Sequence, residues 1–412
     1  MKQARIVCIL ILGVLLIFLL PAPMAIAHDV VNFPDPNLEV AIREAIAKPT
    51  GNIYESDLVG LTYLNARHRD ITDLTGLEYC SDLIWLWLPR NQISDISPLS
   101  SLTSLKGLSL DDNQISDLSP LSSLTSLIGL ELGSNQVSDL SPLSSLTSLI
   151  GLTLWSNQIS DISPLSGLTS LIVLGLEENQ ISDISPLSSL TNLTNLRLTL
   201  NQISDISVLS SLTSLTDLCL WSNQISDISP LSLLTSLIWL GIGDNLISDL
   251  STLSSLTSLR GLELWDNQVS DISSLSSLIS LGFLWLQNNQ ISDISPLVDN
   301  PGISSGDYVG LNDNPLSCTS VCTYIPQLEA RGVTVDCDIR RLEGDINCDG
   351  IIDSADFQLI AQHIVGTITL TGNDFLAADV NDSGTLDSAD LQLVAQYLVG
   401  TITAFPGGPI IT

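Results

Sequence analysis

Two stretches near the carboxyl end of the chain repeat one pattern of oxygen-bearing side chains. Each twelve-residue stretch has carboxylate, amide or hydroxyl groups at positions 1, 3, 5, 9 and 12 and a glycine at position 6. Hard oxygen donors at this spacing suit Ca²⁺, with position 7 adding its backbone carbonyl. We therefore expect two calcium ions. The predicted ligands are Asp345, Asn347, Asp349, Ile351, Asp353 and Asp356 in loop 1, and Asp379, Asn381, Ser383, Thr385, Asp387 and Asp390 in loop 2.

The two loops are near copies, and an apolar helical pattern follows each of them. We expect helices over 357–365 and 391–399. Loop 1 offers four carboxylates, whereas loop 2 offers three because Ser383 stands where loop 1 has Asp349. Since the number of charged ligands tunes the affinity of such loops, we predict that loop 1 binds Ca²⁺ more tightly.

The paired loops resemble a type I dockerin. Residues 353–356 and 387–390 both read Asp-Ser-Ala-Asp, with aspartate at position 12 where common EF-hand loops have glutamate. The resemblance implies a small all-α, EF-hand-like domain over 343–404 that calcium folds and that docks onto a cohesin domain of another protein. In that family, loop positions 10 and 11 carry partner recognition. The residues at those positions are Ser354, Ala355, Ser388 and Ala389.

Most of the remaining chain repeats a 22-residue unit with the pattern Leu-x-x-Leu-x-Leu-x-x-Asn, as at 105–113. The alternating leucines predict a short strand with one buried face, and the later apolar steps of three, interrupted by prolines such as Pro120, predict tight helical turns. Successive strands can stack in parallel on one leucine core. The repeated asparagine should bond backbone groups in each coil. It occurs at Asn91, Asn113, Asn135, Asn157, Asn179, Asn201, Asn223, Asn245, Asn267 and Asn289.

These units are similar to the 22-residue bacterial leucine-rich repeats of internalin-like surface proteins; residues 127–143 fit that motif closely. The resemblance implies an α/β solenoid over 58–311, with parallel strands on the concave face and 3-10 or irregular segments on the convex side. It also implies an N-terminal helical cap over 28–57 and a closing cap over 312–338. Caps are needed because the bare ends of a stacked core would expose leucines.

The family resemblance places the exposed strand positions on the concave face, and all seven tryptophans occupy such positions. Exposed aromatic rings often mark binding surfaces, because they bury much area at low entropic cost. A protein ligand with basic residues and a sugar that stacks on indole rings both fit, since acidic residues are interspersed. The alternative is that tryptophan is tolerated there and spread by duplication of units. The predicted ligand face comprises Trp85, Trp87, Trp155, Trp221, Trp239, Trp265, Phe283 and Trp285.

The first 27 residues have the features of a secretory signal. A positively charged start precedes an apolar stretch at 6–20 and small residues at 25–27. An uncleaved membrane anchor is the alternative reading of this segment. No second apolar run of spanning length follows, and residues 405–412 form a tail. We expect a secreted protein without a transmembrane segment after removal of the signal.

Three cysteines cluster after the repeats, at positions 318, 322 and 337. In an oxidising compartment, one disulfide is expected among them. Cys322–Cys337 and Cys318–Cys337 are the candidate pairs, and the sequence does not choose between them.

Composition and charge restrict the possible functions. The formal net charge of −32 makes nucleic acid an unlikely partner class, because binding to phosphates requires a basic surface. The three histidines, His28, His68 and His363, are far apart in sequence, and no nucleophile or zinc motif accompanies them. We therefore expect a protein that is not an enzyme.

Together these features predict a secreted recognition protein with two attachments. The repeat array would bind a protein or glycan on its concave face, and the dockerin would fix it to a cohesin-bearing partner, placing it at a cell surface or in a complex. One alternative is a carbohydrate-binding accessory component of a polysaccharide-degrading, cellulosome-like complex. Another is a structural spacer whose concave face has no ligand.

Overall fold

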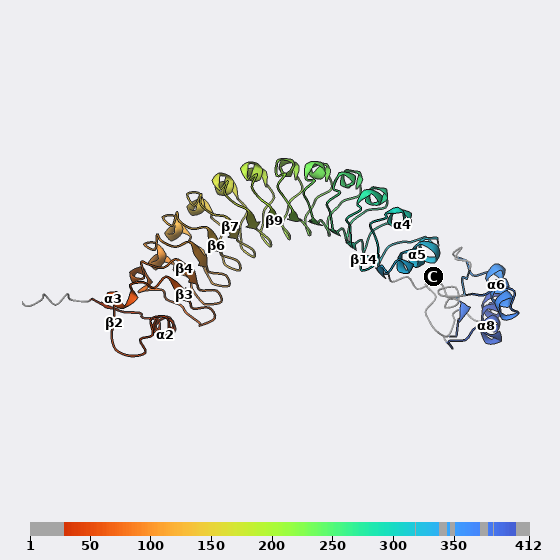
Figure 1. The fold of residues 1–412 in the computed structure, drawn as a ribbon, viewed down its shortest axis with the longest axis horizontal. Coiled ribbons are helices and arrows are strands. Elements are labelled where there is room, and N and C mark those ends of the chain that lie inside the picture. Colours follow the sequence, from red (N-terminus) through yellow and green to blue (C-terminus); the bar gives the residue numbers. More distant parts are fainter. Residues whose placement is uncertain are drawn as a thin grey trace, which may run out of the picture.

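The fold is described from a computed structural model. The described residues are 29–317, 319–337, 344–346, 351–370, 378–381 and 383–400. The predicted signal segment 1–27 and tail 405–412 lie outside them. Figure 1 shows the repeats as an arc, with strands along its inner side and helical turns along its outer side.

A 13-stranded sheet forms the inner side of the arc, and its strands follow one another in chain order. Neighbouring strands are parallel and keep the leucines in register; Leu108, for example, lies opposite Leu130. The strands are β3 (Tyr63–Asn65), β4 (Trp85–Trp87), β5 (Gly107–Ser109), β6 (Gly129–Glu131), β7 (Gly151–Thr153), β8 (Val173–Gly175), β9 (Asn195–Arg197), β10 (Asp217–Cys219), β11 (Trp239–Gly241), β12 (Gly261–Glu263), β13 (Phe283–Trp285), β14 (Tyr308–Gly310) and β15 (Thr334–Asp336). The predicted parallel solenoid is confirmed.

Short 3-10 turns form the outer side of the arc. Before most of them, an aspartate accepts a hydrogen bond from a serine amide, as from Ser119 N to Asp117 Oδ1 at 2.8 Å. Because these turns are wider than a strand, stacking the units curves the array. The turns are η1 (Leu77–Tyr79), η2 (Ser97–Leu99), η3 (Ser119–Leu121), η4 (Ser141–Leu143), η5 (Ser163–Gly167), η6 (Ser185–Ser189), η7 (Ser207–Ser211), η8 (Ser229–Leu233), η9 (Ser251–Ser255) and η10 (Ser273–Ser277).

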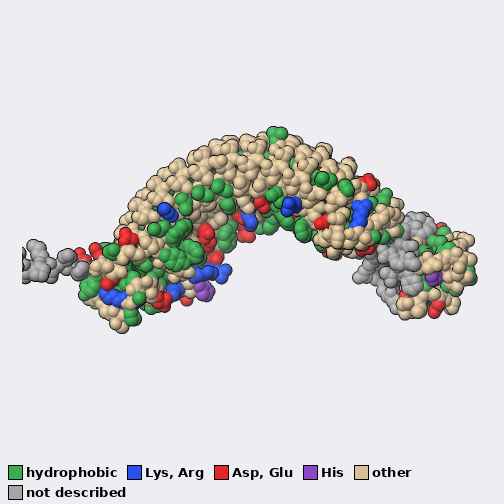
Figure 2. Space-filling view, viewed as in Figure 1, with side chains coloured by type: hydrophobic (Ala, Val, Ile, Leu, Met, Phe, Trp, Pro, Cys, Tyr) green, Lys and Arg blue, Asp and Glu red, His purple; other side chains and the backbone are tan. Residues whose placement is uncertain are grey.

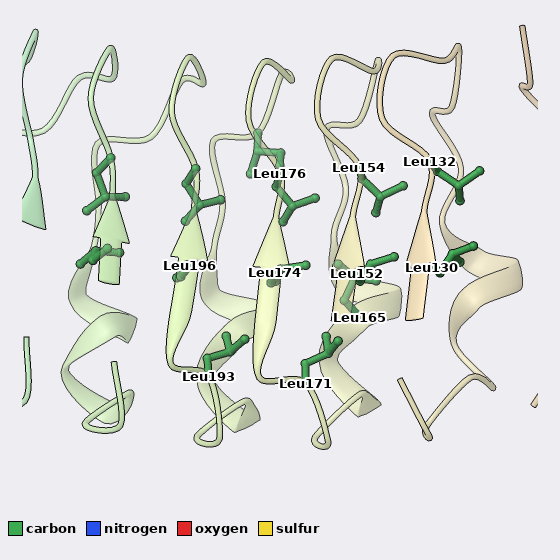
Figure 3. Close-up of a cluster of buried hydrophobic side chains, with 14 of the residues drawn as sticks. Leu130, Leu132, Leu152, Leu154, Leu165, Leu171, Leu174, Leu176, Leu193 and Leu196 are labelled. Atoms are coloured by element: carbon green, nitrogen blue, oxygen red, sulfur yellow. The ribbon is translucent and has the colours of Figure 1, made fainter. Parts of the chain in front are cut away.

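The core of the array is a set of leucine columns that run from coil to coil. Leu130, Leu152, Leu174 and Leu196 form one such column (Figure 3), and each is fully buried. One continuous cluster of buried residues extends from Val31 to Val333. Each coil therefore shields its neighbours, and the two ends need caps.

The asparagine column satisfies backbone groups that the turns leave unpaired. Asn113 Oδ1 accepts a hydrogen bond from Ile93 N at 3.0 Å, and Asn113 Nδ2 donates to the carbonyls of Leu88 and Leu110 at 3.1 and 2.9 Å. The preceding residue, Asp112, is left-handed with φ of 54°. The asparagines are thus structural, as the sequence predicts.

The amino-terminal end of the array is closed by β1 (Val30–Val31), α2 (Pro36–Ala45), β2 (Ile53–Tyr54) and α3 (Glu55–Leu58). Asp35 caps α2 through hydrogen bonds from Asn37 N and Leu38 N. Its other carboxylate oxygen accepts a hydrogen bond from Thr72 N at 2.7 Å, which ties the helix to the first coil. Burial raises the pKa of Asp35, but these hydrogen bonds outweigh that effect and hold the pKa below its usual value.

The carboxyl-terminal end of the array is closed by α4 (Ser295–Asp299), a π-helical turn η11 (Ser320–Tyr324) and α5 (Ile325–Ala330), followed by β15. Cys322 is disulfide-bonded, and Cys318 lies outside the described residues. Cys337 packs, partly buried, against the end of the leucine core. The disulfide bond of Cys322 agrees with one bond in this cluster, and the choice between Cys322–Cys337 and Cys318–Cys337 stays a prediction.

The carboxyl-terminal domain contains α6 (Ser354–Ile364) and α8 (Ser388–Leu398), which contact each other. Its small core includes Ile346, Ile360, Val380 and Val394. Both helices begin three residues before the predicted starts at 357 and 391, because Asp353 and Asp387 cap them from within the calcium loops. Within the described residues, no helix has the length and apolarity to span a membrane.

Candidate functional site

Loop 2 is folded by hydrogen bonds from its own backbone to its acidic first residue. The two carboxylate oxygens of Asp379 accept hydrogen bonds from Ser383 N and Gly384 N at 2.9 and 2.7 Å. Asn381 Oδ1 accepts a further bond from Ser383 N at 2.9 Å. Gly384 has φ of +75°, which suits glycine best and makes the turn that position 6 requires.

Asp390, at position 12, brings a carboxylate into this loop from the first turn of α8. It is fully buried; its Oδ2 accepts a hydrogen bond from Asp387 N at 2.9 Å. Its Oδ1 is buried without a hydrogen-bond partner among the described residues. Burial raises the pKa of Asp390, and the charges of Asp379 and Asp387 raise it further, against the backbone amides of Asp387 and Asn381, which lower it. A buried oxygen without a donor, beside other carboxylates, fits a bound cation.

Loop 1 also buries the carboxylate at its position 12, but both oxygens of that carboxylate accept hydrogen bonds. Asp356 is fully buried and accepts hydrogen bonds from Ile346 N and Asp353 N at 2.7 and 2.9 Å. Asp345 is almost fully buried, whereas Asn347 and Asp349 lie outside the described residues. In the described part of the chain, acidic, histidine and cysteine side chains alone form no cluster of three that could hold a metal. The predicted ligand sets also use amide, hydroxyl and backbone oxygens.

The predicted ligand face lies along the inner side of the arc. Trp85, Trp87, Trp239, Phe283 and Trp285 lie within strands. Figure 2 shows hydrophobic and charged side chains along this inner side, whereas the outer surface of the arc is mostly uncharged. The remaining three tryptophans, which share one position of the repeat, follow the ends of β7, β10 and β12: Trp155, Trp221 and Trp265.

Four of these indole rings lie over a glycine at the same repeat position in the adjacent coil. A Cβ atom on Gly133 would be 2.0 Å from Trp155 Nε1, and one on Gly107 would be 2.1 Å from the Trp85 ring. Trp265 covers Gly243 and Trp239 covers Gly261 in the same way. The rings therefore fill space left by the missing side chains. The sequence signal for this arrangement is a tryptophan and a glycine 22 residues apart.

Several rings form a continuous aromatic cluster near the carboxyl-terminal end of the array. Trp285 lies 5.6 Å from Trp239, 6.0 Å from Phe283 and 5.7 Å from Tyr308, measured between ring centroids. Trp239 Nε1 also donates a hydrogen bond to Glu263 Oε1 at 3.0 Å. Tyr308 was missed by the sequence analysis, because the last coil is longer than 22 residues and Tyr308 falls out of phase with Phe283.

A hollow of about 260 Å³ lies farther toward the amino-terminal end, between Trp155 and Trp221. Glu177 enters it, with Arg197 Nη1 4.0 Å from Glu177 Oε1. Burial raises the pKa of Glu177 although the Arg197 charge opposes this shift. Cys219 also lines the hollow; burial raises the pKa of its thiol to about 11, so it is not an activated nucleophile.

Comparison with known proteins identifies both parts of the chain. The family model for the type I dockerin domain matches residues 343–399. An internalin from Listeria monocytogenes, InlF, has 37% sequence identity and a TM-score of 0.71, and the match covers 77% of this chain and 95% of that one. The chain belongs to the internalin-like leucine-rich repeat proteins. The leucine-rich repeat model matches residues 81–123, 125–167, 147–189, 169–211, 191–233 and 257–299.

Other structures are similar to this internalin-like array over shorter lengths. Internalin C2 of L. monocytogenes has 39% identity and a TM-score of 0.51, over 54% of this chain and 99% of that one. A leucine-rich repeat protein of Leptospira interrogans shares the fold, with 24% identity, a TM-score of 0.54 and coverage of 63% of this chain and 74% of that one. No curated protein matches the sequence. Leucine-rich repeats indicate a protein-interaction module, and the dockerin indicates calcium binding and a cohesin partner.

The predicted docking residues of the dockerin are exposed at equivalent places in its two halves. Ser354 and Ala355 form the first turn of α6, and Ser388 and Ala389 form the first turn of α8. All four side chains are exposed to solvent beside the two predicted calcium loops. They are thus accessible to a partner.

The described histidines of this internalin-like chain are separated in the fold. His68 is left-handed with φ of 58°, in the first coil of the array. His363 belongs to α6 of the dockerin, and its Nδ1 accepts a hydrogen bond from Leu370 N at 2.9 Å. That bond gives His363 a structural role, and His28 lies outside the described residues.

Proposed function

We propose that the protein is a secreted, non-catalytic adaptor with two binding ends. The repeat array binds a protein or glycan on its concave face, and the dockerin holds the array on a cohesin-bearing partner. The observation that carries this proposal is the set of exposed rings along one continuous sheet, in a chain that also carries a dockerin. Trp85, Trp87 and Phe283 are 40, 41 and 46% exposed, although the leucines between them are buried.

Two calcium ions shape the dockerin end in this proposal. In loop 2, Asp379, Asn381, Ser383, Asp387 and Asp390 supply side-chain oxygens and Thr385 its carbonyl. The buried Asp390 Oδ1 supports this ligand set, because a cation would satisfy it. Loop 1 uses the equivalent positions. Calcium then supplies the charge balance that lets these carboxylates be buried together.

Export from the cell follows from the predicted signal segment 1–27. The disulfide at Cys322 supports an oxidising compartment. The dockerin would then place the protein at a surface or in a complex outside the cell.

A second candidate function is a carbohydrate-binding accessory component of a polysaccharide-degrading complex. The hollow between Trp155 and Trp221 favours it, because that hollow combines indole rings with a carboxylate and a guanidinium. A structural spacer has less support, since a spacer does not require exposed rings on its inner face.

A pull-down from a native secretome tests the two ends separately. The bait is the mature chain, with parallel samples in Ca²⁺ and in EDTA. Dockerin partners should be retained in Ca²⁺ and lost in EDTA, whereas partners of the repeats should remain in both. A bait with Trp85, Trp155 and Trp221 replaced by alanine should lose the second group and keep the first. Retention of every partner by this variant would contradict a ligand-binding role for the concave face.

A further inference from the structure

The hollow between Trp155 and Trp221 differs from the rest of the concave face. The two tryptophans occupy the same repeat position three coils apart, so the hollow is roughly 14 Å long at about 4.8 Å per strand. Glu177 and Thr199 occupy that repeat position in the two coils between them. An elongated ligand lying along the array would thus contact an indole ring at each end and polar side chains in the middle.

Leu200 marks this hollow as unusual. It precedes an asparagine of the repeat and is left-handed, with φ of 55°, which is an unfavourable conformation for a leucine. Its side chain is also 41% exposed and lines the hollow. The equivalent residues in the other repeats are all polar: Arg90, Asp112, Ser134, Ser156, Glu178, Ser222, Asp244, Asp266 and Asn288. Neither local conformation nor solvation favours leucine here, so a contact with a ligand is a physical reason for it.

The polar groups of the hollow offer a donor and an acceptor side by side. The Arg197 side chain is 57% exposed, and its Nη1 is 4.0 Å from Glu177 Oε1, too far for a hydrogen bond between them. Glu177 Oε2 is buried without a hydrogen-bond partner among the described residues. Adjacent hydroxyls of a sugar can donate to a carboxylate and accept from a guanidinium at the same time. A lysine or arginine of a protein ligand could pair with Glu177 only by facing Arg197.

We propose that the hollow lined by Trp155, Glu177, Arg197, Leu200 and Trp221 binds a neutral oligosaccharide. Its sugar rings lie against the two indoles and Leu200, and its hydroxyls bond Glu177 and Arg197. The length of the hollow favours a short chain of sugars over a single one. This inference rests on the proposed function of the concave face and names the class of ligand for one part of it.

The test is titration of the mature full-length chain, in Ca²⁺, with cellohexaose, xylohexaose and mannohexaose, followed by calorimetry and tryptophan fluorescence. At least one of the three should bind. Leu200→Ser should weaken that binding by about tenfold, and Trp221→Ala by at least as much. Leu200→Ser is the sharper variant because serine occupies the same position in three other repeats, so the fold is preserved. Gln180→Ala, at an exposed side chain outside the hollow and outside the predicted ligand face, should leave the affinity unchanged.

Other results would overturn the proposal in distinguishable ways. If none of the three hexasaccharides binds, or if Leu200→Ser and Trp221→Ala bind as the native chain does, the hollow is not a site for neutral oligosaccharides. A lysine-rich peptide that binds in their place, with loss on Trp221→Ala, would keep the concave face as a binding surface and replace the class of ligand. If the secretome pull-down also shows no partner that depends on concave tryptophans, the proposed function of that face fails as well.

Discussion

The indole ring of Trp155 occupies the space where a side chain on Gly133 would begin. A Cβ atom added to Gly133 would lie 2.0 Å from Trp155 Nε1, whereas one added to Gly129, in the same coil, would have nothing within 4 Å. Because the same pairing joins Trp265 to Gly243 and both Trp85 and Trp239 to glycines, the positions of the rings depend on residues one coil away.

Gly133→Ala should therefore displace the Trp155 ring. We expect a loss of about 1 kcal/mol in the free energy of unfolding, because the added methyl group takes the space that the ring fills. The fluorescence of Trp155 should also change. It can be measured in a variant in which every other tryptophan is replaced by phenylalanine. Gly129→Ala is the matched control and should change neither quantity by a comparable amount. Equal behaviour of the two variants would contradict the pairing.

Asn179→Ala should destabilise the array more than a surface change beside it. Asn179 Oδ1 accepts from Ile159 N at 3.0 Å, and its Nδ2 donates to the carbonyls of Leu154 and Leu176 at 3.0 and 3.1 Å. Leaving these buried groups unpaired should cost about 2–4 kcal/mol, measured by urea denaturation. Gln180→Ala, at an exposed neighbour, should stay within about 0.5 kcal/mol of the native chain. A similar loss in both would show that the asparagine column is not structural.

Asp111 and Asp117 should affect the pH dependence of stability in opposite directions. Burial raises the pKa of Asp111 to about 6, so ionisation penalises the folded state as pH rises from about 4 to 6. Asp111→Asn keeps an acceptor for Gly133 N. It should therefore be more stable than the native chain at pH 7, by about 1 kcal/mol after allowing for solvent, and equal to it near pH 4.

The Asp117 carboxylate accepts hydrogen bonds from Ser119 N and Oγ, which hold its pKa below the usual value. Its contribution is present above the pKa of the unfolded chain and is lost as pH falls through the lower folded pKa. Asp117→Asn should thus be less stable than the native chain at pH 7, with the difference shrinking in acid. Thermal melts from pH 3 to 8 measure both variants. Two differences of the same sign would contradict these assignments.

The two calcium loops should differ in affinity. Loop 1 has four predicted carboxylate ligands and loop 2 has three. Calorimetry on Asp387→Ala, which leaves loop 1 intact, should therefore show tighter binding than on Asp353→Ala, which leaves loop 2. Chelation of calcium should unfold residues 343–404 while the far-ultraviolet signal of the repeats persists. Equal or reversed affinities would contradict the ligand count.

Much of this architecture could be predicted from the sequence, because the same local requirement recurs in each coil. The 22-residue spacing of Asn113 and its equivalents predicts the strands, their register and the hydrogen bonds of the asparagines. The calcium loops are likewise local, since their ligands lie within twelve residues. Both helices start three residues before the apolar pattern predicts, because Asp353 and Asp387 cap them.

The features that were missed depend on contacts between coils. The hollow at Glu177 exists because two tryptophans, three coils apart, stand on either side of coils that carry smaller residues at the same repeat position. No single repeat contains that information. Tyr308 joins the aromatic cluster only because a longer last coil brings it beside Trp285. The disulfide partner of Cys322 also depends on contacts beyond one repeat, and the sequence alone does not choose it.

The most direct measurement is surface plasmon resonance of the mature chain on a panel of immobilised type I cohesins, in Ca²⁺ and in EDTA. We predict binding to at least one cohesin in Ca²⁺ and none in EDTA. Replacing Ser354, Ala355, Ser388 and Ala389 together by larger charged residues should abolish this binding, and alanine at Trp155 and Trp221 should leave it unchanged. If binding occurs equally in EDTA, or if it depends on the tryptophans and not on these four residues, the two-ended adaptor is wrong.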